Sequence, residues 1–486
     1  MTYNFGTAVA DCVKHRMKEI PNDGMIWIRG FFNEWMIMLC STEALAEVLV
    51  TKSYVFRKPE ILSSSLGRII GFGILLSEGE VHKFARRKLA PAFSYRRIKE
   101  LYPVFWEKSC EAVRAMTLEA ARTESGDLEL QDWGSRATLD IIGVAGLGRD
   151  FGAIQDANNS LVKTYARIMK PSTTALVLVT LRQFLPDMVV SMLPLRQNDD
   201  LNKASEQIRT LCLDLIKAKR DKLAAGEQPE LDILSTALES NVFTDEQVMN
   251  EMMTILVAGH ETMAASINWA IYAMCKHPEM QLRLREEIRS HLPALDSSRD
   301  IVSVDIDGMP YLNAVCNEVL RCYPVVPSTV REPIEDIKVQ GVLIKKGTKL
   351  IIPQWGVNRY HGYWGDDAEE FRPDRWLSSS WSYTGQGDHH EHASGALEVA
   401  SKAMKPVASG GGSTSTYANL TFLHGPRSCI GQSFARAELA CLLAAWVGRF
   451  EFTMKEMDQD IGWKTGFTLK PGKSGFHVRA KALGGF

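Results

Sequence analysis

The sequence predicts a mainly α-helical fold with small peripheral β-sheets. Residues 80–290 follow a helical pattern with few glycines, whereas short strand-like stretches lie at 24–39 and 337–353. The chain shows neither an internal repeat nor the regular alternation of strands and helices that builds a parallel sheet. Its length allows a large core that also encloses a sizeable ligand.

The composition is that of a globular chain without strong charge bias. Of the 486 residues, 45% are hydrophobic and 23% are charged, and the formal net charge is −2. We expect no nucleic-acid partner, because such proteins usually carry a basic excess. The nine cysteines contain no CxxC pair and no framework spacing, which disfavours a disulfide scaffold and a structural zinc site and indicates a reducing compartment.

Two apolar stretches lie within the first 200 residues. The chain opens without the apolar core of a signal peptide. Residues 24–40 and 173–193 are apolar, but both contain charged residues, and the second also contains Pro186. Neither is expected to span a bilayer, although 173–193 could present an apolar surface to one.

The best-defined element is a long central helix. Thr244 precedes Gln247 by three positions, which is a capping-box pattern, and Pro278 marks the other end. The helix has about 33 residues and a length of roughly 50 Å. It is apolar on nearly all sides, so it is expected to pass through the core.

This helix contains the motif AGHET at residues 258–262. Gly259 weakens a helix locally by about 1 kcal/mol, and His260, Glu261 and Thr262 place polar groups at core depth, where they need partners or a purpose. The motif is either a kink satisfied by its neighbours or a groove whose carboxyl and hydroxyl move protons to a bound ligand. The zinc motif HExxH is incomplete, because Ala264 stands where its second histidine would be.

Further polar residues lie in apolar surroundings downstream. Glu318 and Arg321 share one face of a predicted helix. Arg331 follows in an extended apolar stretch, where a guanidinium could hold a ligand anion, and Arg375 lies between aromatic residues in FRPDRW.

Residues 377–418, rich in Ser, Gly, Thr and His, predict a flexible surface insertion. Its cluster of charged and histidine side chains is read as a solvated loop rather than a metal site, since no fold fixes the ligands; these residues are His389, His390, Glu391 and His392.

The most specific pattern precedes the last predicted helix. Phe422, Gly425, Arg427, Cys429 and Gly431 have the spacing FxxGxRxCxG. Glycines allow a sharp turn and a close backbone approach, amide groups at a helix start can stabilise a thiolate, and an arginine can neutralise a carboxylate. The thiolate would be a metal ligand or a nucleophile. A cysteine protease fits poorly, because no His/Asn partner signature flanks the cysteine.

The motifs AGHET, EVLR, FRPDRW and FLHGPRSCIG, in this order within residues 80–450, resemble the cytochrome P-450 haem-thiolate monooxygenases. The stretches GEVHKFARRKLAPAF and FLHGPRSCIGQSFARAELA are most similar to fungal microsomal members of secondary metabolism. The resemblance implies one triangular-prism-like domain over residues 1–486, with haem b between the long central helix and the cysteine-loop helix.

The resemblance also implies a role for each matching residue. Cys429 would be the proximal ligand of the haem iron. Thr262 and Glu261 would manage dioxygen and its protons, while Glu318, Arg321 and Arg375 would form a buried structural ion network. The other residues expected at the cofactor are Arg427, Arg331, His82, Arg86, Phe422, Gly425, Gly431 and Gly259. Candidates for the substrate pocket are Phe72, Ile255, Ala258, Val326 and Phe467.

The chain departs from the family pattern in three respects. The family motif WxxxR is replaced by His82 to Arg86, and the insertion lengthens the gap between Arg375 and Cys429. By resemblance, eukaryotic members open with a membrane anchor and a proline-rich hinge, and neither is expected within residues 1–486.

The expected activity is insertion of one oxygen atom from dioxygen into a lipophilic small molecule, with electrons from NADPH through cytochrome P-450 reductase or with help from cytochrome b5. By resemblance the enzyme would act at a membrane surface, on the cytoplasmic face of the endoplasmic reticulum. Two alternatives stay open: a haem-thiolate isomerase or dehydratase on the same fold, and a non-catalytic haem-binding sensor.

Overall fold

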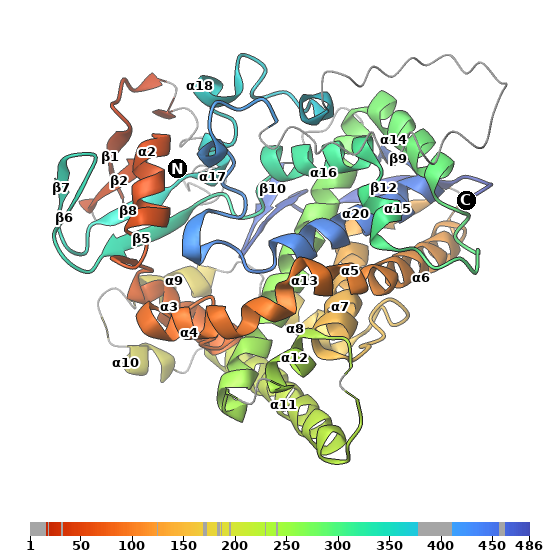
Figure 1. Ribbon diagram of the computed structural model, residues 1–486, viewed down its shortest axis with the longest axis horizontal. Coiled ribbons are helices and arrows are strands. Elements are labelled where there is room, and N and C mark those ends of the chain that lie inside the picture. The colour runs from red at the N-terminus through yellow and green to blue at the C-terminus, as the bar shows by residue number, and fades with distance from the viewer. Residues whose placement is uncertain are drawn as a thin grey trace.

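The computed structural model describes residues 16–17, 19–30, 33–123, 125–168, 173–181, 185, 187–193, 196–228, 230–239, 242–377, 411–455 and 462–486. Within these ranges helices dominate and the strands form small separate sheets (Figure 1), which confirms the predicted fold class. Most of the predicted insertion at 377–418, including its histidine cluster, lies outside the described residues, as does Pro186.

The largest sheet combines the predicted N-terminal strands with later ones in the order β1-β2-β8-β5-β3. Its β1–β2 pair is antiparallel, β8 joins β2 in parallel, and β5 is antiparallel to β8. The strands are β1 (Met25–Arg29), β2 (Trp35–Leu39), β3 (Phe56–Arg57), β5 (Thr329–Pro333) and β8 (Lys349–Ile352). Figure 1 shows this sheet beside the helical body of the protein.

Three smaller sheets complete the strand content of the described residues. The strand-like stretch at 337–353 contains an antiparallel hairpin of β6 (Ile337–Val339) and β7 (Val342–Ile344), joined through Gly341 at φ +79°. A second hairpin, β10 (Trp463–Thr465) with β11 (Leu469–Pro471), carries the turn 466–468. The third sheet has the order β4-β12-β9, with β4 (Asp127–Glu129), β9 (Phe450–Met454) and β12 (His477–Ala482).

The helices pack around the central helix, α13. Those before it are α2 (Thr42–Ala46), α3 (Glu60–Ile70), α4 (Gly79–Leu89), α5 (Tyr95–Glu100), α6 (Tyr102–Ala120), α7 (Leu130–Leu147), α8 (Ser160–Ile168), α9 (Thr173–Leu181), α10 (Asp187–Ser191), α11 (Arg196–Ala224) and α12 (Ile233–Glu239). Those after it are α14 (Pro278–His291), α15 (Ser303–Asp307), α16 (Pro310–Cys322), α17 (Gln354–Val357), α18 (His361–Trp364) and α20 (Gln432–Arg449).

The central helix α13 (Asp245–Lys276) has 32 residues and begins at the capping box expected from Thr244 and Gln247. Its length is therefore roughly 48 Å. It passes between α7 on one side and α20 and α16 on others (Figure 1), inside the main apolar cluster of the protein. The large aromatic side chains of that cluster include Trp133, Trp269 and Trp446.

A second apolar cluster lies under the β1-β2-β8-β5-β3 sheet and includes Ile37 and Leu350. No helix among the described residues combines the length and apolar character required to cross a bilayer.

Candidate functional site

A short stripe of α13 is accessible although the helix runs through the core. Between Glu251 and Ile271 every side chain is buried except at Ala258, Gly259 and Thr262, which are partly accessible. Ala258 and Thr262 are four residues apart and therefore lie on one face of the helix. The hydroxyl of Thr262 donates to the carbonyl of Ala258 at 2.6 Å. The AGHET motif thus opens α13 to an internal space.

Gly259 allows α13 and α7 to pack closely. A Cβ atom built at this position would come within 2.8 Å of the Ile142 side chain on α7. The structure therefore gives this glycine a packing function between the two helices, in addition to its partial accessibility.

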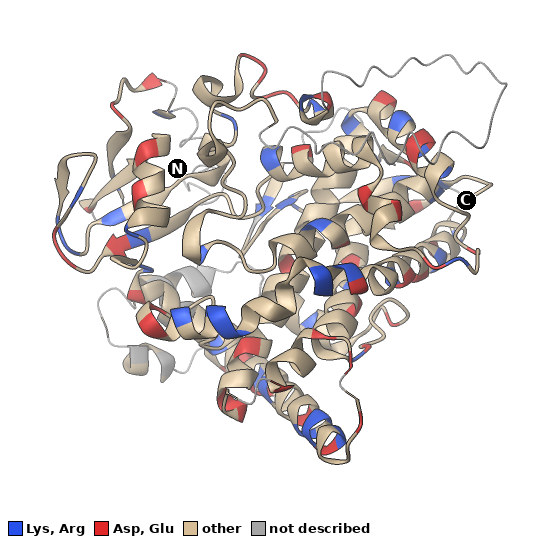
Figure 2. Cartoon of the chain, in the orientation of Figure 1, with Lys and Arg blue, Asp and Glu red and all other residues tan. Residues whose placement is uncertain are grey.

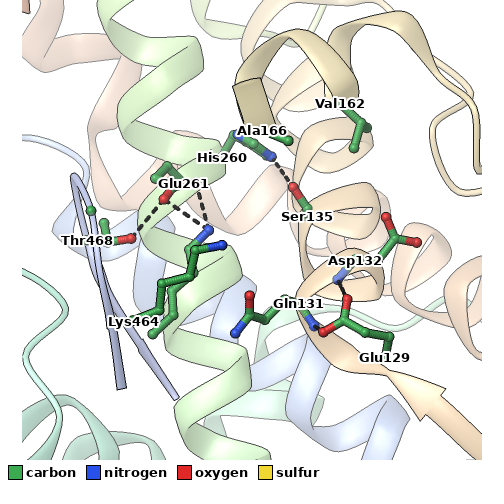
Figure 3. A pocket seen from close by; sticks show the side chains of 12 residues that line it. Glu129, Gln131, Asp132, Ser135, Val162, Ala166, His260, Glu261, Lys464 and Thr468 are labelled. Atoms are coloured by element: carbon green, nitrogen blue, oxygen red, sulfur yellow. Dashed lines mark hydrogen bonds and ion pairs between the residues drawn. The ribbon is translucent and has the colours of Figure 1, made fainter. Parts of the chain in front are cut away.

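The carboxyl group of Glu261 is held by the β10–β11 hairpin. It accepts a hydrogen bond of 2.9 Å from the Thr468 hydroxyl and lies 3.0 Å from the ammonium group of Lys470. Figure 3 shows Glu261 pointing toward this hairpin from α13. The AGHET carboxyl is thus paired, and it is linked to the turn that the sequence placed near the substrate.

The adjacent His260 faces α7. Its Nε2 lies 2.8 Å from the Ser135 hydroxyl, and burial lowers the pKa of the imidazole to about 4, so the ring is neutral. Both His260 and Glu261 line a polar pocket of about 220 Å³ (Figure 3), together with Glu129, Asp132, Lys464 and others. The sequence did not reveal this pocket, because its residues come from four segments far apart in the chain.

The loop before α20 presents Cys429. Its amide donates to the carbonyl of Phe422 at 2.9 Å, which closes the loop. Gly425 has φ +77°, and a Cβ there would lie 2.2 Å from the carbonyl oxygen of Leu49, so glycine is required. Cys429 is exposed, whereas the other described cysteines are buried.

The surroundings of the Cys429 thiol have opposing effects on its pKa. Burial raises its pKa, while the backbone amide of Gly431 and the charge of Arg86 lower it. The sulfur is thus surrounded by protein mass but open on one side. Since α20 begins at Gln432, the sulfur also lies at a helix N-terminus, which favours a thiolate.

Basic side chains gather around a single carboxylate beside this loop. The guanidinium of Arg427 lies 2.5 Å from Glu78, and the ammonium of Lys58 lies 3.6 Å from the same carboxyl group. Burial and the charges of Arg331 and Arg427 lower the pKa of Lys58 to about 7. Burial and Arg427 likewise lower the pKa of Arg331 to about 10. The cations repel one another, so this cluster favours additional negative charge.

Two residues of the replaced WxxxR motif lie next to this cluster. His82 is buried, its Nδ1 is 3.1 Å from the Tyr54 hydroxyl, and burial with Arg427 lowers its pKa to about 4. Arg86 donates to the backbone carbonyl and, at 3.3 Å, to the hydroxyl of Ser428, directly before Cys429. The haem expected from the sequence carries two propionates, and this cationic cluster beside an accessible thiol fits such a group. Lys58 and Glu78 were missed, because neither belongs to a recognisable motif.

Glu318, Arg321 and Arg375 form one buried network. Glu318 binds Arg321 through two hydrogen bonds of 2.8 and 2.7 Å and accepts from Arg375 at 2.9 Å. Arg321 also donates to three backbone carbonyls, those of Asn358, Ala368 and Glu370. The network joins α16 to the segment 358–376 and carries no accessible group for chemistry.

Four of the five candidates for the substrate pocket lie either on α13 or in the two segments that contain Val326 and Phe467. Ile255 is buried on α13, close to Ala258. Val326 and Phe467 are partly buried, and their segments meet where the Leu469 amide donates to the Val325 carbonyl at 2.8 Å. The fifth candidate, Phe72, lies between α3 and α4. It is 60% exposed, and its ring occupies the space beside Gly67.

Comparison with known proteins identifies the family. The cytochrome P-450 family model matches residues 24–478. The chain is 41% identical to the cytochrome P-450 monooxygenase sphH of Aspergillus fumigatus over 97% of this chain and 84% of that protein. It is 39% identical to ALT8 of Alternaria alternata, over 97% and 85% of the two chains, and 42% identical to FUM15 of Gibberella moniliformis, over 88% and 76%. Both are also named cytochrome P-450 monooxygenases. The chain therefore belongs to the cytochrome P-450 family and is a haem-thiolate monooxygenase.

Proposed function

We propose that Cys429 is the thiolate ligand of the haem and that the enzyme inserts one oxygen atom from dioxygen into a lipophilic small molecule. The observation that carries this proposal is the accessible thiol of Cys429 at the start of α20, beside a buried excess of cations. Haem, when bound, supplies the activation of dioxygen. The protein supplies the ligand, the orientation and the protons.

The cationic cluster orients the cofactor. Arg427 and Arg331 are proposed to bind the propionates, with Lys58, His82 and Arg86 beside them. A carboxylate between Lys58 and Arg331 would offset the burial and the repulsion by Arg427 that lower the pKa values of both groups. Phe422 and Gly431 are proposed to shield and stabilise the sulfur, because the first closes the loop and the amide of the second faces the thiol.

Thr262 and Glu261 are proposed to serve proton transfer. Thr262 lies on the accessible stripe of α13, so its hydroxyl can turn from the Ala258 carbonyl to a group in the internal space. Glu261 lines the polar pocket on the other side of the helix and can exchange protons with solvent there. The two residues are adjacent in sequence and connect these spaces.

The substrate is proposed to be a lipophilic secondary metabolite of a fungus. The named relatives are monooxygenases from fungi. The side chains beside the accessible stripe include Ile255 and Val326, which favour an apolar ligand.

Electrons are proposed to come from NADPH through a reductase that docks on α4, with cytochrome b5 as an alternative donor. Figure 2 shows Lys and Arg positions along α4. His82 faces inward, whereas Lys83 and Arg87 are exposed. Positive charge at such a surface steers an acidic partner and sets the rate of association.

Membrane contact is proposed for the helices α9 and α10. Several large apolar side chains are exposed on these helices and directly beside them, which is unusual for a surface that faces only water. They are Val177, Leu185, Met188, Val189 and Met192. This surface would lie against the cytoplasmic face of the endoplasmic reticulum.

The proposed activity is tested with purified protein and a fungal reductase. Addition of dithionite and carbon monoxide should produce the Soret band typical of haem-thiolate ligation. NADPH consumption coupled to oxygenated product, with a panel of apolar metabolites, would support the monooxygenase. Turnover of a substrate without NADPH or dioxygen would instead identify an isomerase or dehydratase.

A further inference from the structure

The segment 70–74, which connects α3 to α4, is bound along its backbone by three polar side chains of α13. Every second residue of the segment makes one of these hydrogen bonds. The Thr254 hydroxyl donates to the Ile70 carbonyl at 2.8 Å, the Phe72 amide donates to Asn250 Oδ1 at 3.1 Å, and the Ile74 amide donates to Glu251 Oε2 at 2.8 Å. We call Asn250, Glu251 and Thr254 the α13 clamp.

The residues between these bonds are glycines that lie flat on the helix. Gly71 has φ +70°, and a Cβ there would come within 2.8 Å of Asn250 Oδ1. A Cβ at Gly73 would lie 2.5 Å from the Thr254 hydroxyl and 2.7 Å from the Asn250 carbonyl. Side chains at either position would push the segment off α13, so the two glycines and the clamp fit together.

Two residues of the α13 clamp are buried, and Asn250 is partly buried. Thr254 is 2% and Glu251 is 6% exposed. Burial raises the pKa of Glu251 to about 7, against the opposing effect of the Ile74 amide. Burial of a carboxyl group is unfavourable unless the group is hydrogen-bonded or paired. Here it holds one defined turn of backbone.

The position of the clamp connects it to the catalytic groups. Thr254, Ala258 and Thr262 are spaced by four residues, so they form one stripe of α13 that extends roughly 12 Å. At its other end, the segment leads directly to Glu78, which contacts Lys58 and Arg427 of the cationic cluster. The clamped segment therefore joins the accessible stripe of α13 to the cofactor side.

We propose that Asn250, Glu251 and Thr254 are positioning residues that fix segment 70–74 as one wall of the substrate site, and so determine how large a ligand reaches the haem. The proposal rests on the haem site described under the proposed function. It assigns the selectivity to backbone held from α13, rather than to the side chain of Phe72, which is exposed.

Hydrogen exchange of the purified holoprotein tests the clamp directly. In Asn250→Ala/Glu251→Ala, the amides of residues 72 and 74 should exchange at least about tenfold faster, because each loses its acceptor. Glu251→Gln keeps an acceptor oxygen and should restore protection of Ile74. Glu246→Ala, an exposed residue on the first turn of α13, is the matched control and should leave the exchange unchanged. Unchanged exchange in the double variant would overturn the clamp.

Binding of azoles to the haem iron tests the consequence for selectivity. Imidazole is small and 4-phenylimidazole is bulky. The ratio of their Kd values therefore measures how much space segment 70–74 leaves for a ligand of the haem iron. Thr254→Val and the double variant should shift this ratio toward the bulky ligand by about fivefold or more, as expected for a coupling near 1 kcal/mol, and Glu251→Gln should keep the parent value. An unchanged ratio with faster exchange would overturn the positioning function. Absence of a thiolate spectrum in the parent protein would instead contradict the proposed function, while hydrogen exchange would still test the clamp.

Discussion

The hydroxyl of Thr262 donates to the carbonyl of Ala258 at 2.6 Å, within the same turn of α13. Threonine in a helix commonly satisfies its hydroxyl in this way. The Thr262 hydroxyl, which is expected to donate a hydrogen bond during dioxygen activation, is therefore bonded to its own helix. It must rotate away from the Ala258 carbonyl to act in the internal space. The accessible position of Thr262 leaves room for that rotation.

Replacement of Thr262 should uncouple the reaction. Thr262→Ala removes the donor but leaves the pocket wall nearly intact, so substrate affinity should change little. The ratio of product to consumed NADPH should fall roughly tenfold or more, with peroxide formed instead. Thr262→Ser keeps the hydroxyl and serves as the control. If the alanine variant retains the parent ratio, the hydroxyl only bonds its own helix.

The ion pair between Glu261 and Lys470 should stabilise the protein. Lys470→Met leaves the buried carboxylate with the Thr468 hydroxyl alone, which should cost about 1–3 kcal/mol. The apparent Tm should fall, and the double variant Glu261→Gln/Lys470→Met should recover part of the loss. Equal Tm values for Lys470→Met and the double variant would contradict the expected recovery.

The buried network around Glu318 should contribute far more than surface pairs do. Glu318→Gln removes the ion-pair partner of buried Arg321 and leaves Arg375 with Asp367 alone, at a cost of about 3–5 kcal/mol. The matched control is Glu80→Gln, which breaks an exposed pair with Lys83 and should cost less than about 1 kcal/mol. Thermal unfolding of the holoproteins compares the two, and similar losses would contradict the assignment.

Glu251 should make stability fall as the pH rises. Its pKa is raised from 4.5 to about 7 in the folded protein, so between these values the folded state holds the proton more tightly than the unfolded state does. The contribution is complete below pH 4.5 and is lost as the pH passes about 7. The Tm of Glu251→Gln relative to the parent should therefore increase from pH 5 to pH 8. A difference that stays flat over this range would contradict the raised pKa.

Charge reversal on α4 should slow electron delivery. Lys83→Glu/Arg87→Glu should lower the rate of haem reduction by the reductase at low salt, and the difference should shrink as ionic strength rises. Lys83 already pairs with Glu80 at 2.6 Å, so Arg87 is expected to carry the larger share. Lys481→Glu on β12 is the control, because that side chain is 75% exposed and lies on a different element. Unchanged reduction rates would rule out this surface.

The elements that could be predicted from the sequence are those marked by patterns of a few neighbouring residues. The capping box at Thr244 set the start of α13, and the spacing from Phe422 to Gly431 marked the loop that presents Cys429. Each signal lies within a few residues, where backbone geometry restricts the choice of amino acid. The periodicity of residues 80–290 likewise predicted the helical fold.

The remaining features depend on contacts between distant segments. Lys58 and Glu78 join the cationic cluster through the fold, and the α13 clamp pairs residues that are more than 170 positions apart in sequence. No single-sequence pattern reports such pairs. The sequence likewise does not report that the apolar ring of Phe72 is exposed and lies beside Gly67.

The central claim is that Cys429 provides the thiolate of the haem site, and the carbon monoxide spectrum of the reduced protein tests it most directly. The parent protein and the control Cys212→Ala, which changes a buried thiol on α11, should both show the Soret band of haem-thiolate ligation. Cys429→Ser should lose that band. A parent protein without it, or a Cys429→Ser variant that keeps it, would contradict the account.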